Sequence, residues 1–349
     1  MEESTLPPTY DYSMSTECNH STDVFQYVGK YADVRKELDY SYHRHYTPER
    51  QLLHDEWMDQ FMQTIIRDGN RTCEAPTQNW IVFTAGPMGA GKSRTMQWLA
   101  SQDLFPLDAY VKVDPDSLRE ILPETKELIR RNPSTAGYLT QKEVGYICEV
   151  LIMNSLNKGK NVLVDGTLRD HVWYAQYFKN LRDRFPNLKI AIIQVKASEA
   201  TVLDRARRRA ESTGRTVPET VLLDTIRILP EAMRILMPLT DFAATFENEN
   251  DSTPLLVEMH APNEGVHLHN DILELSAEVN GRSISREVTC QGVGSQETES
   301  QEVTCTTGLS KKTRCPVLSR RLSNPQSMEA VVAALDIFRD NWLMTCPVL

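Results

Sequence analysis

Residues Trp80 to Met96, WIVFTAGPMGAGKSRTM, contain an apolar run, a glycine-rich turn and the start of an expected helix. The spacing G-x-x-x-x-G-K-S within this stretch is formed by Gly86, Gly91, Lys92 and Ser93. In such a pattern, backbone amides surround an oligophosphate at a helix N-terminus, and glycines allow a close approach that side chains would block. We therefore predict a nucleotide-binding loop composed of Gly86, Pro87, Met88, Gly89, Ala90, Gly91, Lys92, Ser93 and Arg94.

Two side chains of this loop have expected tasks. Lys92 would place a cation beside the β- and γ-phosphates, and the Ser93 hydroxyl would bind Mg²⁺. The apolar residues 80–85 before the loop and the helical pattern of residues 93–101 after it supply the context that the motif requires. A chance match is therefore disfavoured.

Composition and charge narrow the choice of substrate. The chain has 349 residues, of which 40% are hydrophobic, and it carries 38 basic against 48 acidic residues for a net charge of −10. This length and apolar content suffice for a sizeable core. The acidic excess argues against general nucleic-acid binding, so a small-molecule substrate is expected.

Targeting signals are not expected from the sequence. The N-terminal residues MEESTLPPTY lack the basic and apolar regions of a secretory leader, and no apolar run has the length of a membrane span. The seven cysteines are scattered without C-x-x-C spacing. This pattern favours reduced thiols in a cytoplasmic protein, without a disulfide framework or structural zinc.

Strands and helices are expected to alternate along the chain. The expected strands are residues 80–85, 110–114, 161–165 and 188–195, with weaker candidates at 241–246 and 254–259. The expected helices are residues 47–65, 93–101, 115–124, 140–158, 171–184, 199–211 and 218–235. This order predicts an α/β, three-layer P-loop NTPase/kinase fold with a parallel sheet, which binds ligands at the carboxyl ends of its strands.

Four regions are expected along the chain. Residues 1–40 are polar and are expected to lack fixed structure, whereas residues 41–260 should form the α/β domain. Residues 261–326 have the composition of a low-complexity tail, and residues 327–349 contain an apolar periodicity typical of a C-terminal helix. The domain would thus be flanked by flexible tails.

Four acidic residues are candidates for the chemistry. Asp114 and Asp165 each end an apolar strand, and either would hold Mg²⁺ through water. Asp116 lies just beyond a strand and is the candidate general base, although it would also suit the N-cap of the following helix. Glu149 interrupts the apolar helical stretch YICEVLIM, so it contacts either the acceptor or solvent at the helix edge.

An arginine cluster follows the fourth strand. Residues 205–215 include Arg205, Arg207, Arg208, Arg209 and Arg215. Helical spacing places Arg205, Arg208 and Arg209 on one face, from which guanidinium groups would stabilise charge on a transferring phosphoryl group. The alternative is a solvated basic face of a helix.

The ordered set of motifs resembles that of the zeta toxin kinases. The matching pieces are GPMGAGKS, VDPDSLR, the glutamate in YICEVLI, VDGTLR and an R-x(9)-R pair. The resemblance covers roughly residues 47–259 and implies a P-loop enzyme that uses ATP to phosphorylate a sugar hydroxyl of UDP-N-acetylglucosamine.

The resemblance also implies roles for particular residues. Lys92 and Ser93 would bind phosphates and Mg²⁺, Asp116 would be the general base, and Arg205 and Arg215 would contact phosphates. The implied acceptor-binding residues are Asp116, Arg119, Glu149, Asp165, Thr167 and Arg169. The bacterial toxins have a glutamate at the position of Asp165, so the acceptor sugar stays open.

These observations predict an ATP- and Mg²⁺-dependent kinase that acts on a small-molecule hydroxyl. One alternative is a polynucleotide or nucleoside kinase, which the acidic charge disfavours. A second alternative is a non-catalytic, ATP-dependent binding module. The acid at Asp116 argues against it, because a pure binder has no use for a base on the acceptor side.

The histidines and the C-terminal tail add weaker predictions. His43, His45 and His260 are expected to be solvated loop residues rather than metal ligands. The sequence RRLSNP suits phosphorylation of Ser323 followed by 14-3-3 binding, against the alternative of an ordinary basic tail. The terminal CPVL matches a prenylation signal at Cys346, although its proline is atypical.

Overall fold

The computed structural model describes residues 10–63, 66–68, 71–73, 79–249, 253–260 and 320–321. The predicted C-terminal helix, the Ser323 site and the Cys346 site lie outside the described residues. So does nearly all of the predicted low-complexity tail.

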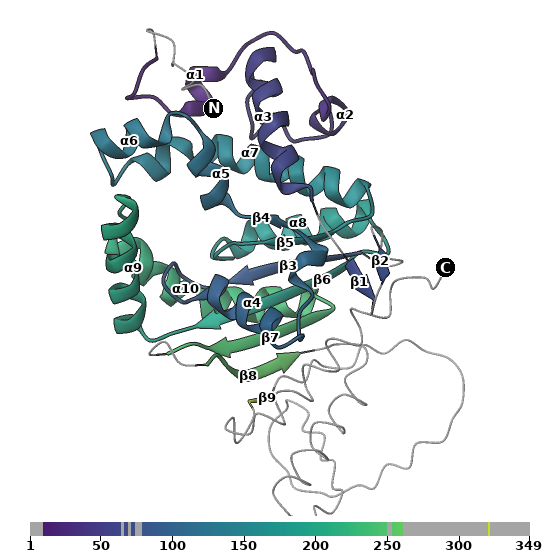
Figure 1. The fold of residues 1–349 in the computed structure, drawn as a ribbon, viewed down its shortest axis with the longest axis vertical. Helices are drawn as coiled ribbons and strands as arrows, with labels where there is room; N and C mark the ends of the chain where they lie inside the picture. Colours follow the sequence, from purple (N-terminus) through teal and green to yellow (C-terminus); the bar gives the residue numbers. More distant parts are fainter. Residues whose placement is uncertain are drawn as a thin grey trace, which may run out of the picture.

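A seven-stranded sheet forms the centre of the molecule, in the order β4-β5-β3-β6-β7-β8-β9 (Figure 1). Strands β3 to β7 pair in parallel, and β8 and β9 are antiparallel. The strands are β3 (Trp80–Ala85), β4 (Tyr110–Val113), β5 (Asn161–Val164), β6 (Lys189–Lys196), β7 (Phe242–Glu247), β8 (Leu255–His260) and β9 (Arg320–Arg321). A separate antiparallel pair consists of β1 (Ile66–Asp68) and β2 (Arg71–Cys73).

All six expected strands are confirmed, but the sheet is not wholly parallel. The chain returns directly from β7 to β8, and a connection this short joins only antiparallel neighbours. The sheet is therefore mostly parallel, as expected, with an antiparallel edge at β8 and β9.

Helices cover both faces of the sheet, which confirms the three-layer fold. Because successive strand residues point to opposite faces, Ile81 and Phe83 pack with α7, α8 and α10, whereas Trp80 and Val82 pack with α4. The longer helices are α3 (Pro48–Phe61), α4 (Lys92–Ser101), α7 (Ala136–Asn157), α8 (His171–Arg184), α9 (Glu199–Thr213) and α10 (Glu219–Leu236). The shorter ones are α1 (Thr16–His20), α2 (Ala32–Arg35), α5 (Pro115–Ile121), α6 (Thr125–Arg131) and the 3₁₀ turns Leu107–Ala109 and Met237–Leu239.

Residues 10–47, called the N-terminal segment below, pack on the domain. Figure 1 shows α1, α2 and α3 grouped beside α7. Arg35 is fully buried and donates to the carbonyls of Val28 and Gln51 and to Asp55 Oδ1 at 2.5 Å. The expectation that residues 1–40 lack fixed structure is wrong for residues 10–40, because a paired, buried guanidinium anchors them instead of a periodic apolar face.

Helix α3 begins where it was expected, but it buries polar as well as apolar side chains. Thr47 caps it by accepting a hydrogen bond from Arg50 N, and the apolar Leu52 is half exposed. Its buried side includes Arg50 and His54, both of which contact Glu143 on α7. Charged hydrogen bonds therefore supplement apolar packing between α3 and α7.

A search of the described helices for a membrane span found none of sufficient length and apolar content.

Candidate active site

The phosphate loop runs from the end of β3 into α4, and three of its glycines have positive φ. The φ angles are 146° at Gly86, 93° at Gly89 and 91° at Gly91. A Cβ at Gly86 would lie 2.5 Å from Val195 O, and one at Gly89 would lie 2.5 Å from Val202 O. The loop geometry thus depends on glycine, and it forms a backbone cradle that fits an oligophosphate at the N-terminus of α4.

Lys92 and Ser93 occupy the first turn of α4. Lys92 Nζ donates to Gly86 O at 3.2 Å and lies 3.8 Å from Asp165 Oδ1. Ser93 and Arg94 are exposed on the following two positions. The Lys92 ammonium group therefore lies beside the backbone of the loop, where it would contact a bound anion.

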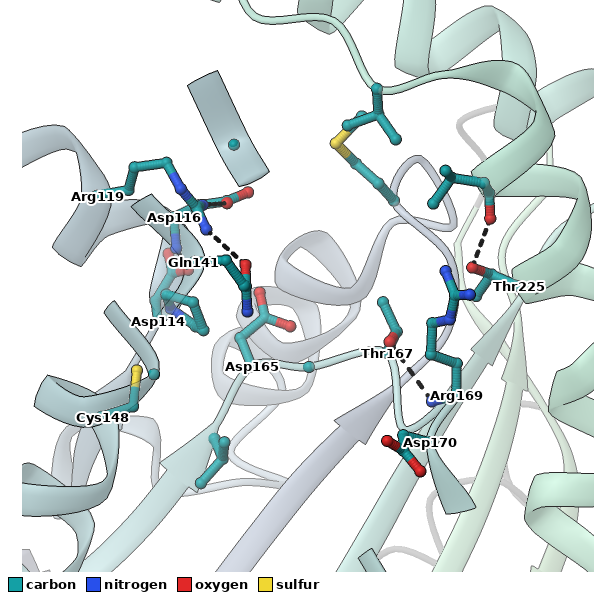
Figure 2. Close-up of a pocket in the computed structure, with 18 of the residues that line it drawn as sticks. Asp114, Asp116, Arg119, Gln141, Cys148, Asp165, Thr167, Arg169, Asp170 and Thr225 are labelled. Carbon is teal, nitrogen blue, oxygen red and sulfur yellow. Dashed lines mark hydrogen bonds and ion pairs between the residues drawn. The ribbon is translucent and has the colours of Figure 1, made fainter. Parts of the chain in front are cut away.

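Asp165 follows β5 at the carboxyl edge of the sheet. Its Oδ1 accepts a hydrogen bond of 2.5 Å from Thr84 Oγ1, at the end of the neighbouring β3. Figure 2 shows Asp165 between Asp116 and Arg119 on one side and Thr167 and Arg169 on the other. Its position beside the loop suits a carboxylate that helps to hold Mg²⁺.

Asp114, the other candidate for Mg²⁺, is engaged in capping α5. Its Oδ1 accepts from Asp116 N at 2.8 Å and its Oδ2 accepts from Ser117 Oγ at 2.6 Å. The alternative reading of Asp116 as this cap is therefore wrong, because the helix begins one residue after Asp114. Asp165, whose Oδ1 lies 3.8 Å from Lys92 Nζ, is the carboxylate of the pair that lies beside the phosphate loop.

Asp116 is surrounded by guanidinium groups. Arg119 Nη1 lies 2.5 Å from Asp116 Oδ1, and Arg209 Nη2 lies 2.8 Å from Oδ2. Arg215 makes a two-pronged contact of 2.9 Å and 3.1 Å. Burial alone would raise the pKa of the Asp116 carboxyl, but the positive charges of Arg215 and Arg119 outweigh burial and hold this pKa below its usual value.

Arg205 lies in a different place from Arg215. Its Nη1 donates to the carbonyls of Gly89 and Ala90 at 3.3 Å and 3.4 Å, on the outer side of the phosphate loop. It does not line the cavity that contains Asp116 and Arg215. The two arginines that were expected to contact phosphates therefore lie in different places, because the same helical face turns toward the loop at Arg205 and toward the cavity at Arg209.

Asn248 was missed by the sequence reasoning. It is fully buried after β7, and its Nδ2 donates to Gly91 O at 3.3 Å and to Thr95 Oγ1 at 3.2 Å. Arg205 donates to both its backbone and side-chain oxygens. Asn248 thereby braces the end of the loop, and its only signal in the sequence is its position after a strand.

One cavity of about 770 Å³ brings most of the predicted site residues together. Leu168, in the loop that forms one wall, is fully buried with a φ of 54°, an uncommon conformation for a non-glycine residue. It separates Thr167 and Arg169, which both face the cavity. The predicted residues that line the cavity are Met88, Lys92, Asp114, Asp116, Arg119, Glu149, Asp165, Thr167, Arg169 and Arg215, together with Arg209.

Glu149 lines this cavity and contacts a histidine of the N-terminal segment. Its Oε1 lies 3.1 Å from His43 Nε2. His43 is buried, and so is His260, which belongs to β8. The expectation of solvated loop histidines is wrong for both, since each packs within the domain.

A family model described as Zeta toxin matches residues 63–255, more than half of the chain. No curated protein sequence matches it.

Several solved structures are similar to this chain. One belongs to the PezAT chromosomal toxin-antitoxin system of Streptococcus pneumoniae, with 20% identity, a TM-score of 0.45 and coverage of 58% of this chain and 78% of that chain. Another is the AvrRxo1-ORF1:-ORF2 structure with ATP, with 15% identity, a TM-score of 0.47 and coverage of 74% and 81%. A third is the Deinococcus radiodurans tunicamycin resistance protein, with 16% identity, a TM-score of 0.25 and coverage of 44% and 81%.

Proposed function

The chain belongs to the zeta toxin family, and on this premise we propose that it transfers the γ-phosphoryl group of ATP to a hydroxyl of a small molecule. One observation carries the proposal. The cation of the phosphate loop, Lys92, and an ionised carboxylate, Asp116, line the same cavity. A donor phosphate and an acceptor hydroxyl each have a matching group there.

The donor side is built to bind and orient the oligophosphate. Backbone amides of the loop and the N-terminus of α4 contact its oxygens, and Lys92 neutralises the β- and γ-phosphates. Ser93 and Asp165 would hold Mg²⁺, which would add positive charge beside the phosphate oxygens. Arg205 and Asn248 hold the loop from outside through its carbonyls, so we assign them positioning roles.

On the acceptor side, the Asp116 carboxylate is the proposed proton acceptor. Asp116 is ionised at neutral pH, so one of its oxygens can accept the proton of an attacking hydroxyl. In this structure its oxygens are occupied by arginines. A phosphate that binds Arg209 and Arg215 would compete with Asp116 for them, which would release a carboxylate oxygen for the hydroxyl.

A nucleotide sugar such as UDP-N-acetylglucosamine is the proposed acceptor. The cavity volume of about 770 Å³ is within the range of small-molecule sites. Glu149, Asp165 and Thr167 line it with oxygen atoms that accept hydrogen bonds from sugar hydroxyls. The chain's aspartate in place of the glutamate expected at position 165 leaves more room beside the sugar.

An acceptor screen tests the proposal. The full chain is incubated with γ-labelled ATP and Mg²⁺ and with nucleotide sugars, nucleosides or a polynucleotide bearing a 5′-hydroxyl, and Lys92→Ala protein serves as the control. Label should move to UDP-N-acetylglucosamine or a related nucleotide sugar with the unaltered chain alone. Preferential labelling of nucleosides or polynucleotide would replace this acceptor, and no labelling of any acceptor would contradict the kinase assignment.

A further inference from the structure

We infer that His43 positions the carboxylate of Glu149 for the acceptor, so that His43 and the neighbouring Tyr42 form part of the acceptor-binding site. The inference rests on the proposed kinase function. It concerns a part of the chain that precedes the family match at residues 63–255. The N-terminal segment would therefore contribute to the acceptor-binding wall of the cavity.

The position of Glu149 motivates the inference. Its side chain is 20% exposed and faces the cavity that also contains Asp165 and Thr167. The residues beside it on α7, Cys148 and Val150, are buried. A carboxylate in this position accepts hydrogen bonds from hydroxyl or amide groups of an acceptor, provided that its side chain is held in one orientation.

His43 is placed to hold that orientation. Its Nε2 lies 3.1 Å from Glu149 Oε1, within ion-pair distance for a protonated imidazole, although neither ring nitrogen has a hydrogen-bond partner among the described residues. The His43 side chain is 1% exposed, and its ring packs edge-on against Tyr42 and Tyr146 with centroid distances of 4.9 Å and 5.3 Å. Rings on two sides prevent the imidazole from turning away from Glu149.

The surrounding segment is itself anchored to α7. The Tyr40 and Tyr146 hydroxyl oxygens lie 3.2 Å apart, and Lys142 Nζ donates to Tyr42 O at 3.2 Å. Lys142 Nζ also lies 3.4 Å from the centroid of the Tyr42 ring, which is exposed at the cavity. Residues 40–43 are thus held on the helix that carries Glu149, and Tyr42 forms part of the cavity wall.

Substitutions at position 43 test the positioning role. We expect His43→Leu to raise the KM for UDP-N-acetylglucosamine about tenfold, with the ATP dissociation constant unchanged within about twofold. His43→Gln should recover most of the loss, because its amide can still donate to a carboxylate. Melting temperatures identify any variant that fails to fold. If His43→Leu does not fold, the acceptor KM of His43→Gln still tests the positioning role.

His45→Leu is the matched control. This residue belongs to the same segment and stacks on Tyr40 with a centroid distance of 4.0 Å, but it makes no described contact with Glu149. Its loss should change the acceptor KM by less than about twofold. An equal rise in KM for His45→Leu and His43→Leu would overturn the inference, because loosening of the segment would then explain both.

A double-mutant cycle separates this inference from the proposed function. In a Glu149→Gln background, His43→Leu should add less than about twofold to the acceptor KM, since its target carboxylate is already gone. Independent, multiplicative effects would contradict the positioning role while leaving the kinase intact. If the unaltered chain phosphorylates no acceptor in the screen, the proposed function fails and this inference with it.

Discussion

The donor side and the acceptor side of the cavity are built by different means. The donor side is one continuous stretch, residues 86–94, whose working groups are mostly backbone amides held by glycine conformations. The acceptor side consists of charged side chains from α5, α7, the loop after β5 and the chain around α9. A site made of backbone groups depends on the local conformation of one segment. A site made of side chains depends on how elements distant in the sequence pack together. The two sides should therefore respond differently to substitution.

Removal of the donor-side cation should have the largest effect. Lys92→Ala takes the positive charge from the loop, and we expect kcat/KM to fall on the order of 10³-fold or more. ATP should also no longer raise the melting temperature, since stabilisation by a ligand requires binding to the native state. Thermal unfolding with and without ATP and Mg²⁺ measures this, and full retention of the ATP-induced shift together with turnover would contradict the assigned role.

Substitutions of Arg215 and Arg205 should have different kinetic effects. Arg215→Ala removes a guanidinium that contacts Asp116 in the cavity, so we expect kcat to fall by about 10² to 10³. Arg205→Ala loosens the loop from outside, so it should raise the KM for ATP more than it lowers kcat. Steady-state kinetics of both variants provide the comparison. Identical kinetic profiles would show that the two arginines act in one place after all.

The donor side should depend on glycine at position 89. Gly89→Ala places a methyl group against Val202 O at a φ of 93°, so we expect a loss of about 1 to 3 kcal/mol in stability or a matching loss in ATP affinity. The control is Gly137→Ala on the acceptor side, where no atom lies within 4 Å of the added Cβ. That substitution in a helix should be neutral or stabilising. Melting temperatures and ATP titrations of the two variants test this prediction, and equal losses for Gly89→Ala and Gly137→Ala would contradict it.

The sequence was most informative where function is local. Lys92 and Ser93 could be predicted as phosphate-loop residues because the motif is contiguous, and the structure begins the following helix at Lys92. The α8 bounds were also predicted correctly, since Asp170 supplies a cap and the apolar pattern ends with Arg184. In such stretches the deciding contacts lie within a few residues, so spacing alone reveals them.

The sequence was least informative about contacts between elements that are distant in the chain. Helical periodicity placed Arg205 and Arg209 on one face, but it does not reveal that the loop lies opposite one and the cavity opposite the other. Asn248 and His43 act on partners more than a hundred positions away, and neither lies in a recognisable pattern. The N-terminal segment was misjudged because the buried Arg35 that anchors it looks like an ordinary surface residue in the sequence.

The smallest predicted effect is a dependence of stability on pH. Asp116→Asn leaves three guanidiniums without their carboxylate, for a loss of about 1 kcal/mol near neutral pH. Because the folded-state pKa of Asp116 is lowered, this contribution is complete above the unfolded-state pKa of about 4 and is lost as the pH falls through the folded-state value. The difference in melting temperature from the unaltered chain should persist at about pH 5 and shrink below about pH 4. Its disappearance between neutral pH and about pH 5 would contradict the lowered pKa.

The most direct test of a divided site is the turnover of Asp116→Asn protein, measured beside its ATP dissociation constant. Removal of the acceptor-side base should lower kcat on the order of 10² to 10⁴-fold, and the ATP dissociation constant should stay within about threefold because the donor side is separate. A fall in kcat of less than about tenfold would contradict the role of Asp116 as the base. A parallel loss of ATP affinity would contradict the division of the cavity into two sides.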